Sequence, residues 1–283
     1  MSTAEGFGFD GVRTAFDAKF NSDSSRGVYL EDGFGGLTKL ADTSDLAPDG
    51  TAFTADFDSP MPGANGPGVV FEGFSNGGSN NGIYLAPNGT TTLTTVATLA
   101  DFPAISADVD SIDLGEPDVD AGRVVFSTRQ NDFDQPFNTP GSTPAASVAF
   151  WENGSLTTIA DQDTVLPNGQ TADFFGESAI AGDYIAFGVF ESGVRTAIVL
   201  HDLSDGTQYS VFELGQVIDG REVTGISFYS RPFLSDGYLA VDLTFDNTDD
   251  IIYRAAIIPE PTSLAMLGIG GLLVARRRHG RAN

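Results

Sequence analysis

The chain has 283 residues, with 14 Lys and Arg against 39 Asp and Glu and a formal net charge of −25. It has no cysteine, which excludes disulfides, thiolate metal sites and a cysteine nucleophile, and its acidic balance argues against nucleic-acid binding. A hydrophobic content of 41% with 22 Phe residues is enough for a packed core and makes a disordered chain a poor interpretation.

A short apolar cluster of strand-forming residues recurs five times. The clusters end at Phe16, Phe71, Phe126, Phe187 and Val241, so they are spaced by 55, 55, 61 and 54 residues. A turn containing Gly precedes each cluster, and an insertion at 132–144, rich in Asn, Pro, Gly and Thr, explains the long interval. Runs of Val, Ile, Thr and Phe between such turns are typical of β-strands.

Each cluster is followed by two further predicted strands. The first of these is expected at 26–30, 82–85, 147–151, 197–201 and 251–254, and the second at 37–41, 93–97, 156–160 and 208–212. A short apolar stretch ahead of each turn supplies a fourth strand. The fifth unit lacks its last strand, because the sequence after 251–256 runs directly into Pro259.

Four short antiparallel strands in each unit of roughly 50 residues predict a β-propeller, in which packing the sheets around an axis buries both faces of each sheet. A β-sandwich is the alternative, although it does not require a constant period. The segment 233–241, with its Ser-Asp-Gly turn, resembles the blades of Tol-B-type propellers. We therefore expect an all-β fold over 1–256. Its blades are expected at about 6–55, 56–116, 117–175, 176–229 and 230–256, the last one incomplete.

The densest acidic stretch lies near the middle of the chain. Its candidate calcium ligands are Asp108, Asp110, Asp113, Asp118 and Asp120, with Glu116 among them. Calcium prefers oxygen ligands from flexible acidic loops. The stretch lacks the EF-hand spacing, however, and alternating Asp is also typical of a solvated loop. A weaker second cluster is formed by Asp242, Asp246, Asp249 and Asp250.

The sequence gives little support for catalysis. His201 is the only histidine of the body and is predicted to be structural. Glu72 and Glu191 are the two carboxylates that could approach a central cleft in a glycosidase, which needs such a pair. We expect a non-catalytic binding or structural role without a cofactor other than calcium. A carbohydrate-active propeller enzyme and a calcium-dependent adhesion module are the alternatives.

The tail combines three features in order. Pro259, Glu260 and Pro261 precede an uncharged segment at 263–275, and Arg276, Arg277 and Arg278 follow it. The uncharged segment predicts a short transmembrane helix of about 20 Å, against about 30 Å of hydrocarbon in a bilayer. The positive-inside rule places the three Arg on the cytoplasmic side, so that they stop transfer across the membrane.

The tail at 257–283 resembles the PEP-CTERM sorting signal, also catalogued as the ice-binding protein C-terminal domain. The resemblance implies that exosortase, a membrane protease, recognises the tripeptide at 259–261 and processes the tail. It also implies export, tethering to the inner membrane through the C-terminus, and transfer to the cell surface or extracellular matrix. The acidic face and loops of the body are expected to bind exopolysaccharide or divalent cations. Because Met1–Glu5 contains no export signal, we expect the native chain to begin upstream, with a signal or more blades.

Overall fold

Strands form most of the chain that can be described. The computed structural model describes residues 3–19, 25–63, 65–75, 80–102, 111–114, 117–131, 146–228, 233–235, 237–246 and 250–257. The strands of this part form five antiparallel sheets. Pro259–Pro261, the predicted helix at 263–275 and Arg276–Arg278 lie outside the described residues.

The first, second and fourth sheets each have four strands in sequence order. The first contains β1 (Thr3–Phe9), β2 (Thr14–Lys19), β3 (Arg26–Glu31) and β4 (Leu37–Asp42). The second contains β5 (Phe53–Pro62), β6 (Val69–Ser75), β7 (Asn80–Ala86) and β8 (Thr94–Thr98), followed by the 3₁₀ turn η2 (Leu99–Asp101). The fourth contains β14 (Phe174–Ala181), β15 (Tyr184–Glu191), β16 (Val194–Asp202) and β17 (Gln208–Glu213).

In the third and fifth sheets, the place of the first strand is taken by two separate segments. Both segments pair with the same next strand of the sheet, which corresponds to β2, β6 and β15 of the other sheets and is called the second main strand below. The third sheet contains β9 (Ser111–Leu114), β10 (Asp118–Asp120), β11 (Arg123–Asn131), β12 (Ala146–Glu152) and β13 (Ser155–Asp161), and both β9 and β10 pair with β11. The fifth contains β18 (Val217–Ile218), β19 (Arg221–Ser227), β20 (Leu234–Ser235), β21 (Tyr238–Phe245) and β22 (Asp250–Ala256), and both β19 and β20 pair with β21. Two predicted boundaries, at 116 and 229, therefore cut across a sheet. In the described part of the fifth sheet, β22 pairs with β21 alone.

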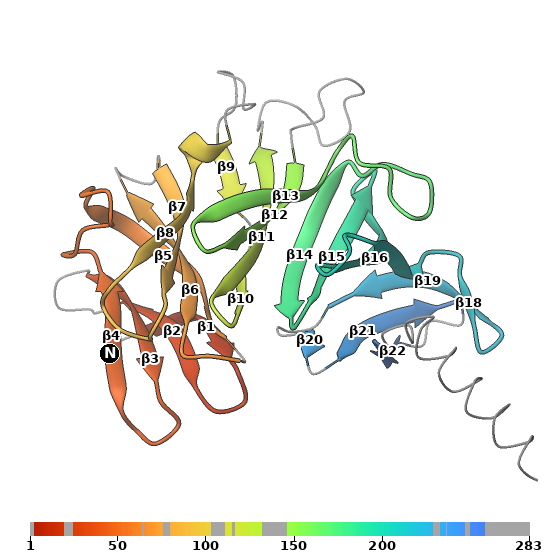
Figure 1. Ribbon diagram of the computed structural model, residues 1–283. Helices are drawn as coiled ribbons and strands as arrows, with labels where there is room; N and C mark the ends of the chain where they lie inside the picture. Colours follow the sequence, from red (N-terminus) through yellow and green to blue (C-terminus); the bar gives the residue numbers. More distant parts are fainter. Residues whose placement is uncertain are drawn as a thin grey trace, which may run out of the picture.

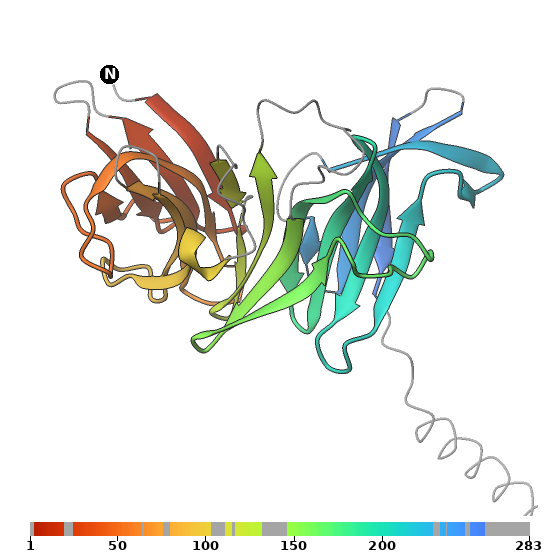
Figure 2. The same cartoon turned by 90° about the horizontal axis from the view of Figure 1, so that it is seen from above.

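The sheets follow one another around an open arc in chain order, with the first and fifth at its two ends (Figures 1 and 2). Equivalent positions repeat from sheet to sheet. The residues Phe16, Phe71, Phe126, Phe187 and Val241 all lie on the second main strand and pair with Tyr29, Tyr84, Ala149, Val199 and Tyr253. The predicted recurrent cluster is thus the same structural position in each sheet.

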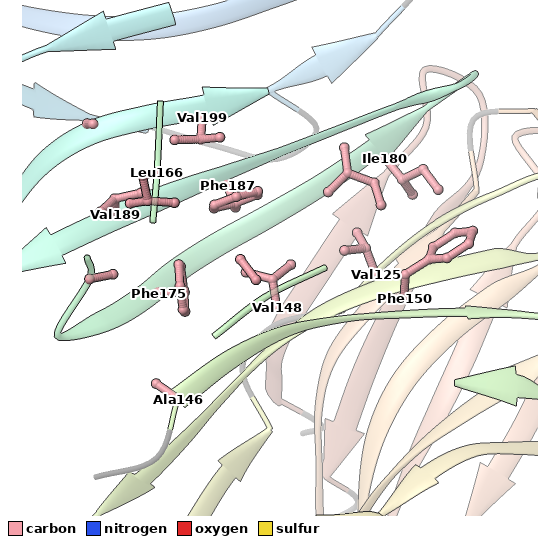
Figure 3. Close-up of a cluster of buried hydrophobic side chains, with 14 residues drawn as sticks. Val125, Ala146, Val148, Phe150, Leu166, Phe175, Ile180, Phe187, Val189 and Val199 are labelled. Carbon is pink, nitrogen blue, oxygen red and sulfur yellow. The ribbon is translucent and has the colours of Figure 1, made fainter. Parts of the chain in front are cut away.

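Four apolar clusters hold the arc together, one between each pair of successive sheets. Figure 3 shows the cluster between the third and fourth sheets, where Val125, Val148 and Phe150 meet Phe175 and Phe187. Alternation along each strand sends successive side chains to opposite faces, so an inner sheet contributes to two clusters. Burying a side chain as large as Phe187 contributes roughly 3 kcal/mol.

Candidate functional site

The acidic stretch predicted as a calcium site reaches the junction between the third and fourth sheets. Asp118 and Asp120 lie on β10, and both side chains are buried. Asp113 lies on β9, where its backbone pairs with Arg129 of β11. Asp108 and Asp110 are outside the described residues. The structure therefore places two of the five predicted carboxylates in a buried site.

Asp118 binds backbone amides of two strands. One carboxylate oxygen, Oδ2, accepts a hydrogen bond from the amide of Ile180 on β14 at 2.9 Å, and Oδ1 accepts one from Val119 at 2.9 Å. Burial disfavours the charged form and raises the pKa of Asp118 to about 7, although both amide hydrogen bonds lower it. Asp118 is thus a buried acid that can change its charge near neutral pH.

Asp120 joins the same two sheets through a turn. Its Oδ2 accepts a hydrogen bond from the amide of Gly182, in the turn between β14 and β15, at 2.8 Å. The tight turn at Ala121 and Gly122, both with positive φ, returns the chain so that Arg123 lies beside Asp120. The Arg123 Nη2 atom is 3.4 Å from Oδ2 of Asp120 and donates to the carbonyl of Gly182 at 2.6 Å.

The same device recurs between the first and second sheets. Arg13 forms an ion pair with Asp10 at 2.6 Å, and its Nη2 donates to the carbonyls of Gly63 and Gly66 at 2.7 and 2.6 Å. Burial of Asp10 raises its pKa, but hydrogen bonds from the amides of Arg13 and Val12 and from the guanidinium outweigh burial and leave it lowered. We call this contact, in which an Arg pairs with an Asp of its own turn and binds carbonyls of the next sheet, an arginine joint. Its sequence signal is an Asp followed three residues later by an Arg across the turn between the first two strands of a sheet.

A third arginine connects the fourth and fifth sheets. Arg195 on β16 forms an ion pair with Glu177 on β14, and its Nη1 donates to the carbonyl of Ile226 on β19 at 3.3 Å. The guanidinium lies over the rings of Phe190 and Phe228, 4.9 and 4.8 Å from their centroids. Three of the few arginines of this acidic chain therefore bind backbone carbonyls across sheet boundaries.

The chemistry of the buried carboxylates is determined by these contacts. The Oδ2 atoms of Asp118 and Asp120 accept amide hydrogen bonds from the fourth sheet, while Oδ1 of Asp120 is buried without a hydrogen-bond partner. Among the described residues, no three His, Asp or Glu side chains converge as metal ligands would. Calcium binding by the full acidic stretch stays a prediction, since part of that stretch is not described.

The other residues singled out in the sequence lie apart from this junction. His201 is buried on β16, and burial lowers its pKa, so that the neutral imidazole is favoured at neutral pH. Glu72 lies on β6 of the second sheet and Glu191 on β15 of the fourth, with the third sheet between them. Asp242 is buried on β21, where Ser227 Oγ is 3.4 Å from its Oδ2. The structure does not bring Glu72 and Glu191 into adjacent sheets.

The second acidic cluster is only partly described. Asp246 is exposed, Asp250 begins β22, and Asp249 lies outside the described residues.

In the part of the chain that the structure covers, none of the helices has the length and apolar character needed to span a membrane. The predicted membrane segment is not within that part.

The PEP-CTERM protein-sorting motif matches residues 258–278 of the chain. No curated protein matches the chain. Among solved structures, an oligogalacturonate lyase in complex with manganese is similar at 13% identity, with a TM-score of 0.53 over 93% of this chain and 65% of that one. The polysaccharide lyase Uly1 is similar at 12% identity, with a TM-score of 0.51 over 91% and 58%.

TolB from Acinetobacter baumannii is a weaker match, at 12% identity with a TM-score of 0.44 over 89% of this chain and 54% of that one. The chain spans less than two thirds of the length of these three structures.

Fold and motif together define a class: an all-β protein with several four-stranded antiparallel sheets in a propeller-like arrangement, followed by a PEP-CTERM sorting tail. The motif implies export, recognition by an exosortase and sorting to the cell surface.

Proposed function

We propose that this chain is a surface or extracellular-matrix protein that acts by binding or as a structural component and catalyses no reaction. The observation that carries the proposal is the sorting motif at 258–278, which directs the sheet domain to the outside of the cell. The contacts of the domain are in keeping with a packing role for its buried charged groups. Asp118, Asp120, Arg13, Arg123 and Arg195 all bind backbone atoms of a neighbouring sheet.

Sorting proceeds in three steps under this proposal. The apolar segment at 263–275 enters the inner membrane, Arg276–Arg278 hold its end in the cytoplasm, and exosortase cuts near Pro259–Pro261. The domain then leaves the membrane and associates with the cell surface, where exopolysaccharide is the partner we propose. A short segment suits brief retention, because its Gly residues weaken a helix.

The test replaces Pro259, Glu260 and Pro261 with Ala in the exporting host. Mass spectrometry of the recovered protein gives its two ends, and fractionation gives its location. We expect the variant to stay with the inner membrane at full length, whereas the wild type reaches the surface without Arg276–Asn283. Thr262→Ala, directly beside the tripeptide, is the control and should be sorted normally. Equal sorting of wild type and the triple variant would contradict the proposal.

A carbohydrate-active enzyme is the second candidate, because two structures with TM-scores of 0.53 and 0.51 carry lyase titles. Incubation of the chain with oligogalacturonate, with and without manganese, tests it through formation of unsaturated products. Product formation at a rate that depends on enzyme concentration would replace the non-catalytic role. Calcium-dependent adhesion is tested separately, by comparing the melting temperature in millimolar calcium with that in chelator.

A further inference from the structure

The strand β22 continues almost to the sorting tripeptide. It pairs with β21 along its whole length. One residue further, the amide of Ile257 donates a hydrogen bond to the carbonyl of Gly237 at 2.7 Å. In the sequence, only Ile258 separates this hydrogen-bonded residue from Pro259. The tripeptide therefore follows the folded sheet directly, without a linker of any length.

This spacing leaves a protease little room. Two extended residues span about 7 Å, so Pro259 can lie no further than this from Ile257. Under the proposed sorting mechanism the membrane segment begins at Ser263, and the six residues from Ile257 to Ser263 span about 20 Å at full extension. The active site of exosortase must therefore hold the tripeptide between the sheet domain and the bilayer.

The residues just before the tripeptide are already hydrogen bonded to the domain. Proteins often bind an extended peptide by adding it as a strand, through main-chain hydrogen bonds. Near the end of β22 the backbone of Ala255 pairs with β21, and the amide of Ile257 is also used. The side chains of both residues pack against the apolar cluster between the fourth and fifth sheets. An enzyme that binds the residues before Pro259 as a strand thus competes with β21 for the same backbone groups.

The end of β22 buries less apolar surface than the equivalent strands of other sheets. At the position of Arg254, the first, second and fourth sheets bury Leu30, Leu85 and Leu200. Arg254 is exposed, and its guanidinium lies over the ring of Tyr238, 3.5 Å from its centroid. Stacking at an exposed site contributes less than the burial of a Leu side chain. Separation of this end of β22 from β21 therefore costs less free energy than the same step in those sheets.

We propose that Arg254–Ile257 form a strap that separates from β21 when exosortase binds the tripeptide, and that this separation limits the rate of processing. The inference rests on the proposed function, since it assumes that exosortase cuts near Pro259–Pro261. Release of the strap adds four extended residues, about 14 Å, to the reach of the tripeptide. It also frees their amides and carbonyls to pair with the enzyme. Once the tail is cut off, the strap pairs with β21 again.

A disulfide between β21 and β22 tests the proposal, because the chain has no cysteine of its own. Tyr238 and Ala256 lie directly opposite one another and are exposed. Because the neighbouring residue Ile257 is hydrogen bonded to Gly237, they form a non-hydrogen-bonded pair, with Cα atoms about 4.5 Å apart, as a disulfide needs. Export brings the chain into an oxidising compartment, where the bond forms.

The measurement is the rate at which the tail is lost in the exporting host, followed by mass spectrometry of the full chain. We expect the oxidised variant with Tyr238→Cys and Ala256→Cys to be processed more than about tenfold more slowly than the wild type, since its strap cannot open. The single variants are the controls. Ala256→Cys should be processed at the rate of the wild type, and Tyr238→Cys at least as fast, because it loses the stacking with Arg254.

A spacer distinguishes a closed strap from a general defect of the variant. Insertion of Gly-Ser-Gly-Ser between Ile258 and Pro259 supplies reach without separation of the strap, so it restores processing of the oxidised double variant. Processing of that variant at the rate of the wild type overturns the proposal, and so does a spacer that restores nothing. The proposed function fails in a different way, namely when the chain with Ala at 259–261 loses its tail as fast as the wild type.

Discussion

The two ends of the arc expose equivalent sheets to water in different ways. The fifth sheet places the guanidinium of Arg254 over the ring of Tyr238, and Val217 and Ile252 are its large exposed aliphatic residues in the part that the structure describes. The first sheet keeps aromatic side chains at the positions that are buried in the sheets between the ends. The difference shows that equivalent positions of the repeat differ in burial from one sheet to another. Its contribution to stability depends on whether a neighbouring sheet covers it.

The largest expected effect compares one position in two sheets. Phe187→Ala removes a ring buried between the third and fourth sheets and should lower the free energy of unfolding by about 3–5 kcal/mol. Phe16→Ala, at the equivalent position of the first sheet, should cost less than about 1.5 kcal/mol because Phe16 is only partly buried. Urea denaturation of both variants measures the contrast. Equal losses would mean that Phe16 is covered in the folded chain as completely as Phe187.

A second prediction uses the charge of Asp118. Its pKa rises from 3.8 to about 7 on folding, so between these values the folded state holds a proton that the unfolded state has released. Stability from this group therefore falls as pH rises from about 4 to about 7 and is constant above that. Asp118→Asn removes this fall, so its stability relative to the wild type should rise by about 2–4 kcal/mol from pH 4.5 to pH 8, since each pH unit between the two pKa values contributes about 1.4 kcal/mol. Asn has one acceptor oxygen where Asp118 uses two, so the variant also loses one amide hydrogen bond at every pH.

The measurement is chemical denaturation of both proteins at several pH values, with Asp242→Asn as the control, because Asp242 is buried at the arc end. Parallel pH profiles for the wild type and Asp118→Asn would show that Asp118 keeps an ordinary pKa. The result would then assign its role at the junction to hydrogen bonding of a permanently charged carboxylate.

The sequence predicts the repeat well because the recurrent cluster depends on local alternation. Phe71, Phe126 and Phe187 lie on the predicted strands, with Tyr84 and Val199 opposite two of them. The interrupted first strands were not predicted, since β9 and β19 are recognisable only from their pairing with β11 and β21. A short strand without a strong pattern owes its structure to its partner.

The candidate site was harder to predict than the fold. The acidic pattern around Asp118 and Asp120 predicts a cation site, and this stays a prediction. The contacts that the structure does show were not predicted: both side chains accept hydrogen bonds from the amides of Ile180 and Gly182, about sixty residues later. The local sequence does not predict that backbone amides of a neighbouring sheet will donate hydrogen bonds to these oxygens. The spacing from Asp120 to Arg123, repeated at Asp10 and Arg13, was visible, but its meaning depends on the sheet that follows.

The arginine joints are the third test and extend the comparison to the boundaries between sheets. Arg13→Ala removes the donor to the part-buried carbonyls of Gly63 and Gly66 and should cost about 1–3 kcal/mol. Arg123→Ala removes the donor to the exposed carbonyl of Gly182 and should cost less, about 0.5–1.5 kcal/mol. Because the two joints lie in different boundaries, their effects should add in the double variant. Lys39→Ala is the control, since its half-exposed ion pairs contribute about 0–1 kcal/mol. Thermal denaturation that ranks Lys39 with the arginines would contradict this assignment.

The smallest effect on stability concerns Arg254. Arg254→Leu removes the stacking on Tyr238, worth about 0.5–1 kcal/mol at an exposed site. It also places Leu at the position where the first, second and fourth sheets bury Leu30, Leu85 and Leu200. The change should nevertheless alter behaviour in solution, because the outer face of the fifth sheet then becomes apolar, with Ile252 and Leu side by side on β22. We expect Arg254→Leu to self-associate more strongly than the wild type as the protein concentration rises, measured by sedimentation velocity. If Arg254→Leu and the wild type associate equally, Arg254 does not protect this face, and the contrast between the two ends must come from the aromatic residues of the first sheet alone.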